Sequence, residues 1–142
     1  MMDEKDLLIL EMLSKNARIP YLKIAKILNI SDTAVRKRIK RLEEKGIIEG
    51  YTIKIDPEKL GYKSVAHIGI NTTPDNFLKV ACRLTEMDAV KCVAIVAGGH
   101  SIMVDVWAKD SQHLENVLDE IKSMEGVVSV NPSVILERLK SW

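Results

Sequence analysis

The chain has 142 residues, of which 46% are hydrophobic, and its formal net charge is +1. This length suffices for one ordinary domain or two small ones with an apolar core. The sequence contains no run of about eighteen uncharged apolar residues and opens without a basic segment followed by an apolar one, so we expect a cytoplasmic protein with no membrane partner.

The positive charge is concentrated near the N-terminus. Residues 1–60 contain 13 Lys or Arg against 10 Asp or Glu, whereas residues 61–142 contain 8 against 10. Such an uneven distribution points to different partners for the two parts of the chain. The two cysteines, Cys82 and Cys92, stand in apolar segments without the close spacing of a metal or redox site, so we expect buried thiols and no disulfide.

The first 30 residues carry the pattern of two amphipathic helices. Asp3 is placed to cap a helix in which apolar residues recur at helical spacing and which closes at residues 16–18. A second, shorter helix is predicted for residues 20–28, because Pro20 suits a first turn and the apolar residues after it share one face. A turn at residues 29 and 30 follows.

A third helix is predicted for residues 31–45. Ser31 is a favourable N-cap and Gly46 is a stop signal. Three short helices with a tight turn before the third form a helix-turn-helix arrangement. The residues spaced to face its core are Val35, Ile39 and Leu42.

The opposite face of the third helix is basic. Residues 36–41 read Arg-Lys-Arg-Ile-Lys-Arg, which places five cations in six positions. A major groove admits one α-helix, whose N-terminal side chains reach base edges while cations further along meet phosphates. The predicted base-reading residues are Ser31, Asp32, Thr33, Arg36 and Lys37, and the predicted phosphate contacts are Lys40 and Arg41, with Arg38 at the flank.

This basic face has alternative interpretations. Arg38 is placed either to meet a phosphate or to pair with an acidic residue. The whole face is alternatively a solvated helix surface on which Glu43 and Glu44 neutralise the cations. The two preceding helices, at the spacing of a helix-turn-helix, favour DNA binding.

The pattern changes after residue 46. Ile53 and Ile55 alternate with polar residues, which predicts a strand, and Pro57 with Gly61 marks a turn. The strand is either a wing of the DNA-binding domain or a hinge to a second domain, and we favour the hinge. We therefore expect a DNA-binding domain at residues 1–50, a hinge strand and linker at 51–61, and a second domain at 62–142.

The second domain reads as strand, helix, strand, strand, helix, strand. This βαββαβ order is the ferredoxin-like motif, so the fold class is α+β. Two helices cover only one face of a four-stranded sheet, and some strands here are apolar on both faces. We expect the second face to meet a partner, most simply a second copy in a homodimer. The expected elements are residues 65–72, 74–87, 90–97, 102–108, 111–124 and 127–136.

The chain resembles the Lrp/AsnC, or feast/famine, family of bacterial and archaeal transcription regulators. The resemblance extends over essentially the whole chain, and it is closest to archaeal members in "SDTAVRKRIK" followed by "LEEKGIIEGYTIKI". It implies an N-terminal winged helix-turn-helix domain, a hinge strand, and a C-terminal ferredoxin-like sandwich domain for effector sensing and dimerisation. It also implies a sequence-specific regulator of pseudo-palindromic promoter sites, its own promoter among them, that acts as a dimer, tetramer or octamer.

The resemblance assigns a role to the loop in "AGGHSIMVD". Family members carry a glycine, two variable residues and an aspartate there, and the loop helps to bind an amino-acid effector between subunits. Gly98 matches the glycine, but Ser101 stands where the acid is expected. A hydroxyl offers an ammonium group only a neutral acceptor, so we expect a different effector or none. The candidate effector residues are Gly98, Gly99, His100, Ser101, Asn131 and Ser133.

Two other functions stay open for the whole chain. One is an enzyme on the same architecture, because the siroheme decarboxylases resemble this family in both halves. The other is a sequence-tolerant DNA-architectural protein. The basic face favours a DNA-binding regulator over an enzyme, and the spacing of the histidines and acids predicts no metal site, no cofactor and no catalytic residue. Gly98 and Gly99 are expected at positive φ in a tight turn.

Overall fold

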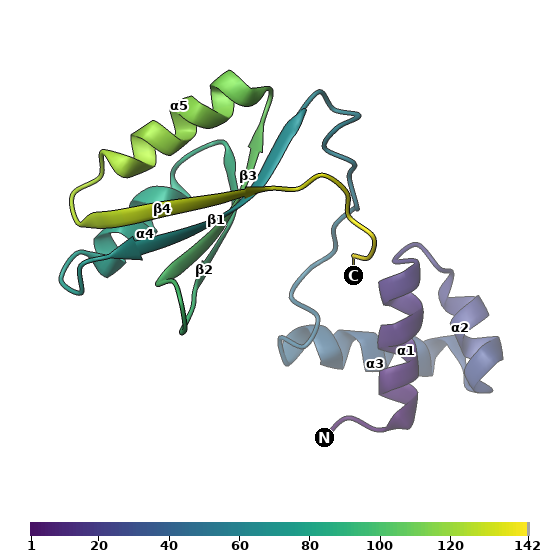
Figure 1. Ribbon diagram of the computed structural model, residues 1–142. Helices are drawn as coiled ribbons and strands as arrows, with labels where there is room; N and C mark the ends of the chain where they lie inside the picture. Colours follow the sequence, from purple (N-terminus) through teal and green to yellow (C-terminus); the bar gives the residue numbers. More distant parts are fainter. Residues whose placement is uncertain (142) are drawn as a thin grey trace. The chain divides into compact units, whose positions relative to one another are not determined.

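The protein is described by a computed structural model over residues 1–141. The chain forms two compact units, residues 1–54 and 55–141 (Figure 1). Each unit has its own hydrophobic core. Within residues 1–141 no helix has the length and apolar character needed to cross a membrane.

The first unit consists of three helices, α1 (Glu4–Lys15), α2 (Tyr21–Leu28) and α3 (Asp32–Glu44). The predicted cap of α1 is confirmed as a capping box, in which the side chains of Asp3 and Asp6 each accept a hydrogen bond from the other's backbone N–H. Ile9 of α1 and Ile24 of α2 are fully buried against α3. The apolar stripe predicted for α3 is also confirmed, since Val35, Ile39 and Leu42 are all buried.

The segment between the units has no regular secondary structure. The strand predicted around Ile53 and Ile55 is not formed in the single chain, and both side chains are exposed, Ile53 by 75%. The physical reason is that a strand needs a neighbouring strand to satisfy its backbone N–H and C=O groups. No such neighbour exists among the described residues.

The second unit is a four-stranded antiparallel sheet with two helices on one face (Figure 1). The βαββαβ order is confirmed, and the strand order is β2-β3-β1-β4. The helix predicted from residue 74 begins three residues later, because residues 74–76 form a turn closed by a hydrogen bond from the Asn76 N–H to the Thr73 carbonyl. The elements are β1 (Ser64–Thr72), α4 (Phe77–Thr85), β2 (Val90–Ile95), β3 (Ile102–Ala108), α5 (Ser111–Lys122) and β4 (Val127–Val134).

The sheet has a helix-covered face and an open face. Ile68 of β1 and Val104 of β3 pair across the sheet and are buried under α4 and α5. The alternate residues point to the open face, where the expected apolar character holds for Met103 and Trp107, while the side chains from β1 and β4 are largely polar. The open face comprises Val65, His67, Gly69, Asn71, Cys92, Ala94, Met103, Asp105, Trp107, Ser129, Asn131 and Ser133.

The prediction that both cysteines are buried is wrong. Cys82 on α4 and Cys92 on β2 are exposed and unpaired. β2 is an edge strand, and Cys92 pairs in register with Asp105 on the open face, where no helix covers it. The thiol of Cys92 is therefore exposed although its segment is apolar, because the segment forms a strand at the edge of the sheet.

Candidate nucleic-acid interface

The helix α3 presents to solvent a part of the basic face that the sequence predicts. Ser31 caps it, accepting a hydrogen bond from the Ala34 N–H at 3.1 Å. With the apolar stripe of α3 turned to the core, the side chains of Thr33, Lys37 and Lys40 remain exposed to solvent. The first turns of the helix therefore offer hydroxyls and cations to a partner.

Arg36 is exposed but held in a defined position. Its Nε lies 3.2 Å from Oδ2 of Asp32 one turn earlier, and its guanidinium lies over the ring of Tyr21, 5.1 Å from the ring centre. Such a cation–π contact and an i,i+4 ion pair restrict a long side chain at modest energetic cost. With 63% of its side chain exposed, Arg36 keeps donors available outside the protein.

Lys37 and Lys40 are the least constrained cations of this face. Within residues 1–141 no carboxylate lies at ion-pair distance from Lys37, and Lys40 has only Glu44 at 3.9 Å. The alternative in which Glu43 and Glu44 neutralise the face is weakened further, because Glu43 instead accepts a hydrogen bond from the Tyr51 hydroxyl at 2.7 Å. Burial, and then this bond, raise the pKa of Tyr51 to about 12.

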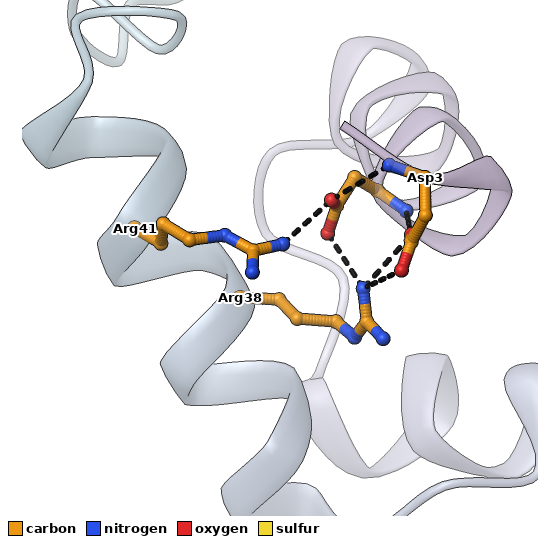
Figure 2. Close-up of polar contacts among 4 residues, drawn as sticks. Asp3, Arg38 and Arg41 are labelled. Atoms are coloured by element: carbon orange, nitrogen blue, oxygen red, sulfur yellow. Dashed lines mark hydrogen bonds and ion pairs between the residues drawn. The ribbon is translucent and has the colours of Figure 1, made fainter. Parts of the chain in front are cut away.

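Arg38 and Arg41 turn away from the exposed face and toward the start of α1 (Figure 2). Arg38 Nη1 donates to both oxygens of Asp3, at 2.8 and 2.7 Å, and to Asp6 Oδ1 at 2.9 Å. Arg41 Nη2 donates to Asp6 Oδ2 at 2.6 Å. For Arg38 the acid-pairing alternative is the one that the structure adopts; for Arg41 the pairing was not anticipated.

Asp6 is the centre of this cluster and its side chain is fully buried. Burial by itself raises the pKa of a carboxyl group, but the hydrogen bonds from the Asp3 backbone and Arg38, together with the charge of Arg41, hold the pKa of Asp6 below its usual value. The hydrogen bond from Arg38 likewise lowers the pKa of Asp3. Both carboxyl groups are therefore ionised at neutral pH.

The candidate effector loop folds back over the open face of the sheet. Gly98 has a φ of 136°, as predicted, whereas Gly99 does not adopt the positive φ that was expected. The ring of His100 lies so close above Gly69 that a Cβ there would be 2.5 Å from it. Ser101 is fixed through its backbone, whose N–H donates to the Ile70 carbonyl at 3.1 Å.

Two residues that sequence reasoning missed complete this region. Asn71 donates to Ser129 Oγ at 3.0 Å and approaches His100 Nδ1 at 3.4 Å. Asn131, a predicted candidate, donates to the Gly69 carbonyl at 3.2 Å. Ser133 lies two residues further along β4, opposite His67, whose Nδ1 contacts Asp105 Oδ1. Only the strand register brings these residues together, and a single sequence carries no signal for it.

The other features of the second unit are separate from this loop. A hollow of about 460 Å³ lies beside α4 and α5, lined by Arg83, Met87 and His113 among others, and none of the candidate effector residues lines it. Among residues 1–141 no three His, Cys, Asp or Glu side chains are placed to hold a metal ion.

Both units have relatives among known proteins. Residues 2–49 match a family described as winged helix-turn-helix DNA-binding, and residues 65–141 match the Lrp/AsnC ligand binding domain. The HTH-type transcriptional regulator LrpA of Pyrococcus abyssi is 52% identical over 99% of this chain and 100% of its own length.

Solved structures show the same similarity. E. coli AsnC matches with a TM-score of 0.90 at 26% identity, over 100% of this chain and 97% of that chain. A feast or famine regulatory protein from M. tuberculosis, complexed with L-methionine, matches with a TM-score of 0.90 at 27% identity, over 99% and 96% of the two chains. The similarity therefore extends through both units.

Proposed function

The chain belongs to the Lrp/AsnC family and is a DNA-binding transcription regulator, and from this premise we propose that it reads pseudo-palindromic promoter sites through α3. The observation that carries the proposal is that α3 exposes basic side chains to solvent and that Ser31 caps the N-terminus of this helix. An α-helix presented in this way fits a major groove. We place the protein in the cytoplasm, at promoter DNA that includes its own.

We assign base reading to the first two turns of α3. Arg36 is the strongest candidate, since a restrained guanidinium can make a bidentate contact with guanine. Lys40 lies nearer the C-terminus of α3, and we assign it to a phosphate. The assigned base-reading residues are Ser31, Asp32, Thr33, Arg36 and Lys37.

We propose that the protein acts as a homodimer or a larger assembly. Two features of the single chain support this. The segment in which Ile53 and Ile55 alternate with polar residues has no strand partner among residues 1–141, and Met103 and Trp107 on the open face of the sheet are only partly covered. A dimer with two α3 helices would bind half-sites about 34 to 36 Å apart, or a multiple of that spacing, in a palindromic site.

We propose that the loop at residues 98–101 does not select a free α-amino acid. The M. tuberculosis relative is complexed with L-methionine, which supports an effector role for this kind of domain. Here, however, Ser101 supplies no carboxylate for an ammonium group, and the ring of His100 already fills the space above Gly69. We propose no catalytic activity, in keeping with relatives that are named transcriptional regulators.

Selection of bound fragments from genomic DNA, with and without a pool of free amino acids, tests the function. We expect a shared palindromic motif and no dependence on the pool. Equal binding to random and selected duplexes would indicate an architectural protein instead. A tetrapyrrole absorbance that copurifies with the protein would indicate the enzyme alternative.

Variants of α3 test the residue assignment on the selected duplex. We expect Arg36→Ala to weaken specific binding by about 1 to 3 kcal/mol and to relax the base preference. Lys40→Ala should lower the salt dependence of binding by about one unit of slope at unchanged preference. Binding like that of the unaltered protein by both variants would refute the assignment.

A further inference from the structure

The Asp6 cluster, which we define as Asp3, Asp6, Arg38 and Arg41, removes two cations from the basic face of α3. Both carboxylate oxygens of Asp6 are occupied, one by Arg38 at 2.9 Å and the other by Arg41 at 2.6 Å and the Asp3 N–H at 3.1 Å. Formally, two carboxylates and two guanidinium groups sum to zero charge. Two of the three arginines of α3, Arg38 and Arg41, are therefore bound to carboxylates of the cluster, whereas Arg36 lies outside it with 63% of its side chain exposed.

Departure of the two arginines from Asp6 is costly. A buried carboxylate without partners loses its hydration and gains nothing in exchange, and the loss is larger when the group is ionised. The side chain of Asp6 has no exposed surface, and its lowered pKa keeps it ionised at neutral pH. A DNA phosphate must therefore compete for each arginine against a carboxylate that has no access to water.

The two arginines differ in how exposed they are and in how many carboxylates they bond. Arg38 is the more enclosed, with 23% of its side chain exposed, and it also bonds both oxygens of Asp3. Arg41 is 43% exposed, and among residues 1–141 its guanidinium bonds only Asp6. Loss of the Asp6 charge should therefore release Arg41 first.

We infer that Asp6 is a positioning residue of the DNA-binding surface, which withholds Arg38 and Arg41 from DNA phosphates and so limits sequence-independent affinity. This inference rests on the proposed function of α3. Phosphate contacts supply essentially all of non-specific binding, and each additional one steepens its salt dependence. With the arginines held at Asp6, the outward cations are Arg36, Lys37 and Lys40, and discrimination between sites depends on the first turns of α3.

The variant Asp6→Asn tests the inference, because it keeps the shape of the side chain and removes its charge. Affinity is measured at several salt concentrations for a duplex selected from genomic DNA and for a random duplex of equal length. We expect the salt slope to steepen by about 0.9 for each arginine released, or about 1.8 for both. Between 50 and 200 mM salt this adds a loss of affinity of about 3.5-fold per released arginine. Binding to the random duplex at low salt should strengthen, so that the ratio of selected to random affinity falls.

Glu11→Gln is the matched control. It removes one negative charge from the same helix, but Glu11 is exposed, and within residues 1–141 its carboxylate bonds only Lys15 of α1, at 2.6 Å. Its salt slope should equal that of the unaltered protein. A steepening as large as that of Asp6→Asn would mean that net charge, and not release of the arginines, causes the effect, and would overturn the inference.

A double variant identifies the released group. Asp6→Asn combined with Arg41→Gln should give a slope about 0.9 shallower than Asp6→Asn alone. In the unaltered background, Arg41→Gln should remove no phosphate contact. A slope that falls by about 0.9 in that background would show that Arg41 meets DNA while bound to Asp6, and would overturn the inference.

A merely structural role of Asp6 is distinguished by the sign of the effect. Partial unfolding lowers the active fraction without steepening the salt slope.

If Asp6→Asn does not fold, Asp3→Asn replaces it, because asparagine is an equally good N-cap and the change loosens only Arg38. A smaller steepening of the salt slope is then expected, and an unchanged slope would refute the inference.

Failure of the proposed function and failure of the inference give different results. If the unaltered protein shows no preference for the selected duplex, the proposed function fails. If the preference holds and Asp6→Asn keeps the original slope, only the inference fails.

Discussion

The two units of the chain differ in what they bury. The helical unit buries seven hydrophobic residues beside the ionised carboxylate of Asp6, whereas the sheet unit buries fifteen hydrophobic residues and, within the described chain, no ionisable side chain. A small core leaves the orientation of its helices less determined by packing, and a hydrogen-bonded ion cluster between α1 and α3 adds a directional constraint. The larger core leaves the open face of the sheet available for polar residues. The two units therefore position their candidate binding surfaces in different ways. In the helical unit a charged cluster orients α3, and in the sheet unit the strand register brings together the residues of the open face.

Truncation of a core residue in each unit should have the largest effect and tests whether the units are independent. Ile24→Ala and Ile68→Ala each remove a fully buried side chain, at a cost of about 2 to 5 kcal/mol. We expect Ile24→Ala to reduce amide hydrogen-exchange protection in residues 1–54 and to abolish DNA binding, and Ile68→Ala to affect residues 55–141. If either variant lowers protection equally in both units, the chain folds as one cooperative unit and the comparison fails.

Acid should separate the units next. The pKa values of Asp3 and Asp6 are lowered in the folded state, so their contribution to stability is complete above the unfolded-state value of about 3.9 and is lost as the pH falls below it. We expect the helical unit to lose stability more steeply than the sheet unit as the pH falls below about 4, as followed by unit-resolved hydrogen exchange. In Asp6→Asn this difference should shrink; an equally steep loss would show that the Asp6 cluster does not set acid sensitivity.

Matched helix caps sharpen the comparison at lower energy. Ser31 caps α3 and Asp110 caps α5, with cap hydrogen bonds of 3.1 and 2.8 Å. Replacement of either by alanine should cost about 1 kcal/mol of stability in thermal denaturation. Only Ser31→Ala should also weaken DNA binding, because α3 carries the basic face. Equal weakening by Asp110→Ala would imply that DNA affinity depends on the stability of the whole chain.

Exposed ion pairs should show the smallest effect in both units. Lys40 lies 3.9 Å from Glu44 on α3, and Lys79 lies 3.5 Å from Glu125 in the second unit. Each of Glu44→Gln and Glu125→Gln should change the free energy of unfolding by less than about 0.5 kcal/mol, because both pairs are solvated. A cost above about 1 kcal/mol for Glu44→Gln alone would show that surface charge, as well as the Asp6 cluster, stabilises the helical unit.

The sequence predicts features that depend on neighbours along the chain. The cap at Asp3, the cap at Ser31 and the buried stripe of Val35, Ile39 and Leu42 all follow from local spacing, and the structure confirms them. The βαββαβ order also follows from local patterns along the chain, and the structure confirms it. The exposed positions of Thr33, Lys37 and Lys40 were predictable because helical periodicity places them opposite that stripe.

Features that depend on tertiary contacts were not predictable. Arg41 pairs with Asp6 across 35 positions of sequence, and only the crossing of α1 over α3 places them together. The approach of His100 to Gly69 depends on the pairing of β1 with β3. The exposure of Cys92 follows from its edge strand, and the strand predicted around Ile53 has no partner among residues 1–141. In each case the deciding neighbour is distant in sequence.

The two exposed cysteines make the chain its own probe of assembly. Cys92 lies on the open face of the sheet, and Cys82 lies on α4, which covers the other face. An assembly that stacks open faces would shield Cys92 from an alkylating reagent and leave Cys82 reactive, so the ratio of the two labelling rates reports association without any added tag. Alkylation would also affect the assembly itself, because a bulky adduct on Cys92 would block the stacking of the open faces. The handling of thiols during purification would then decide which assembly is observed.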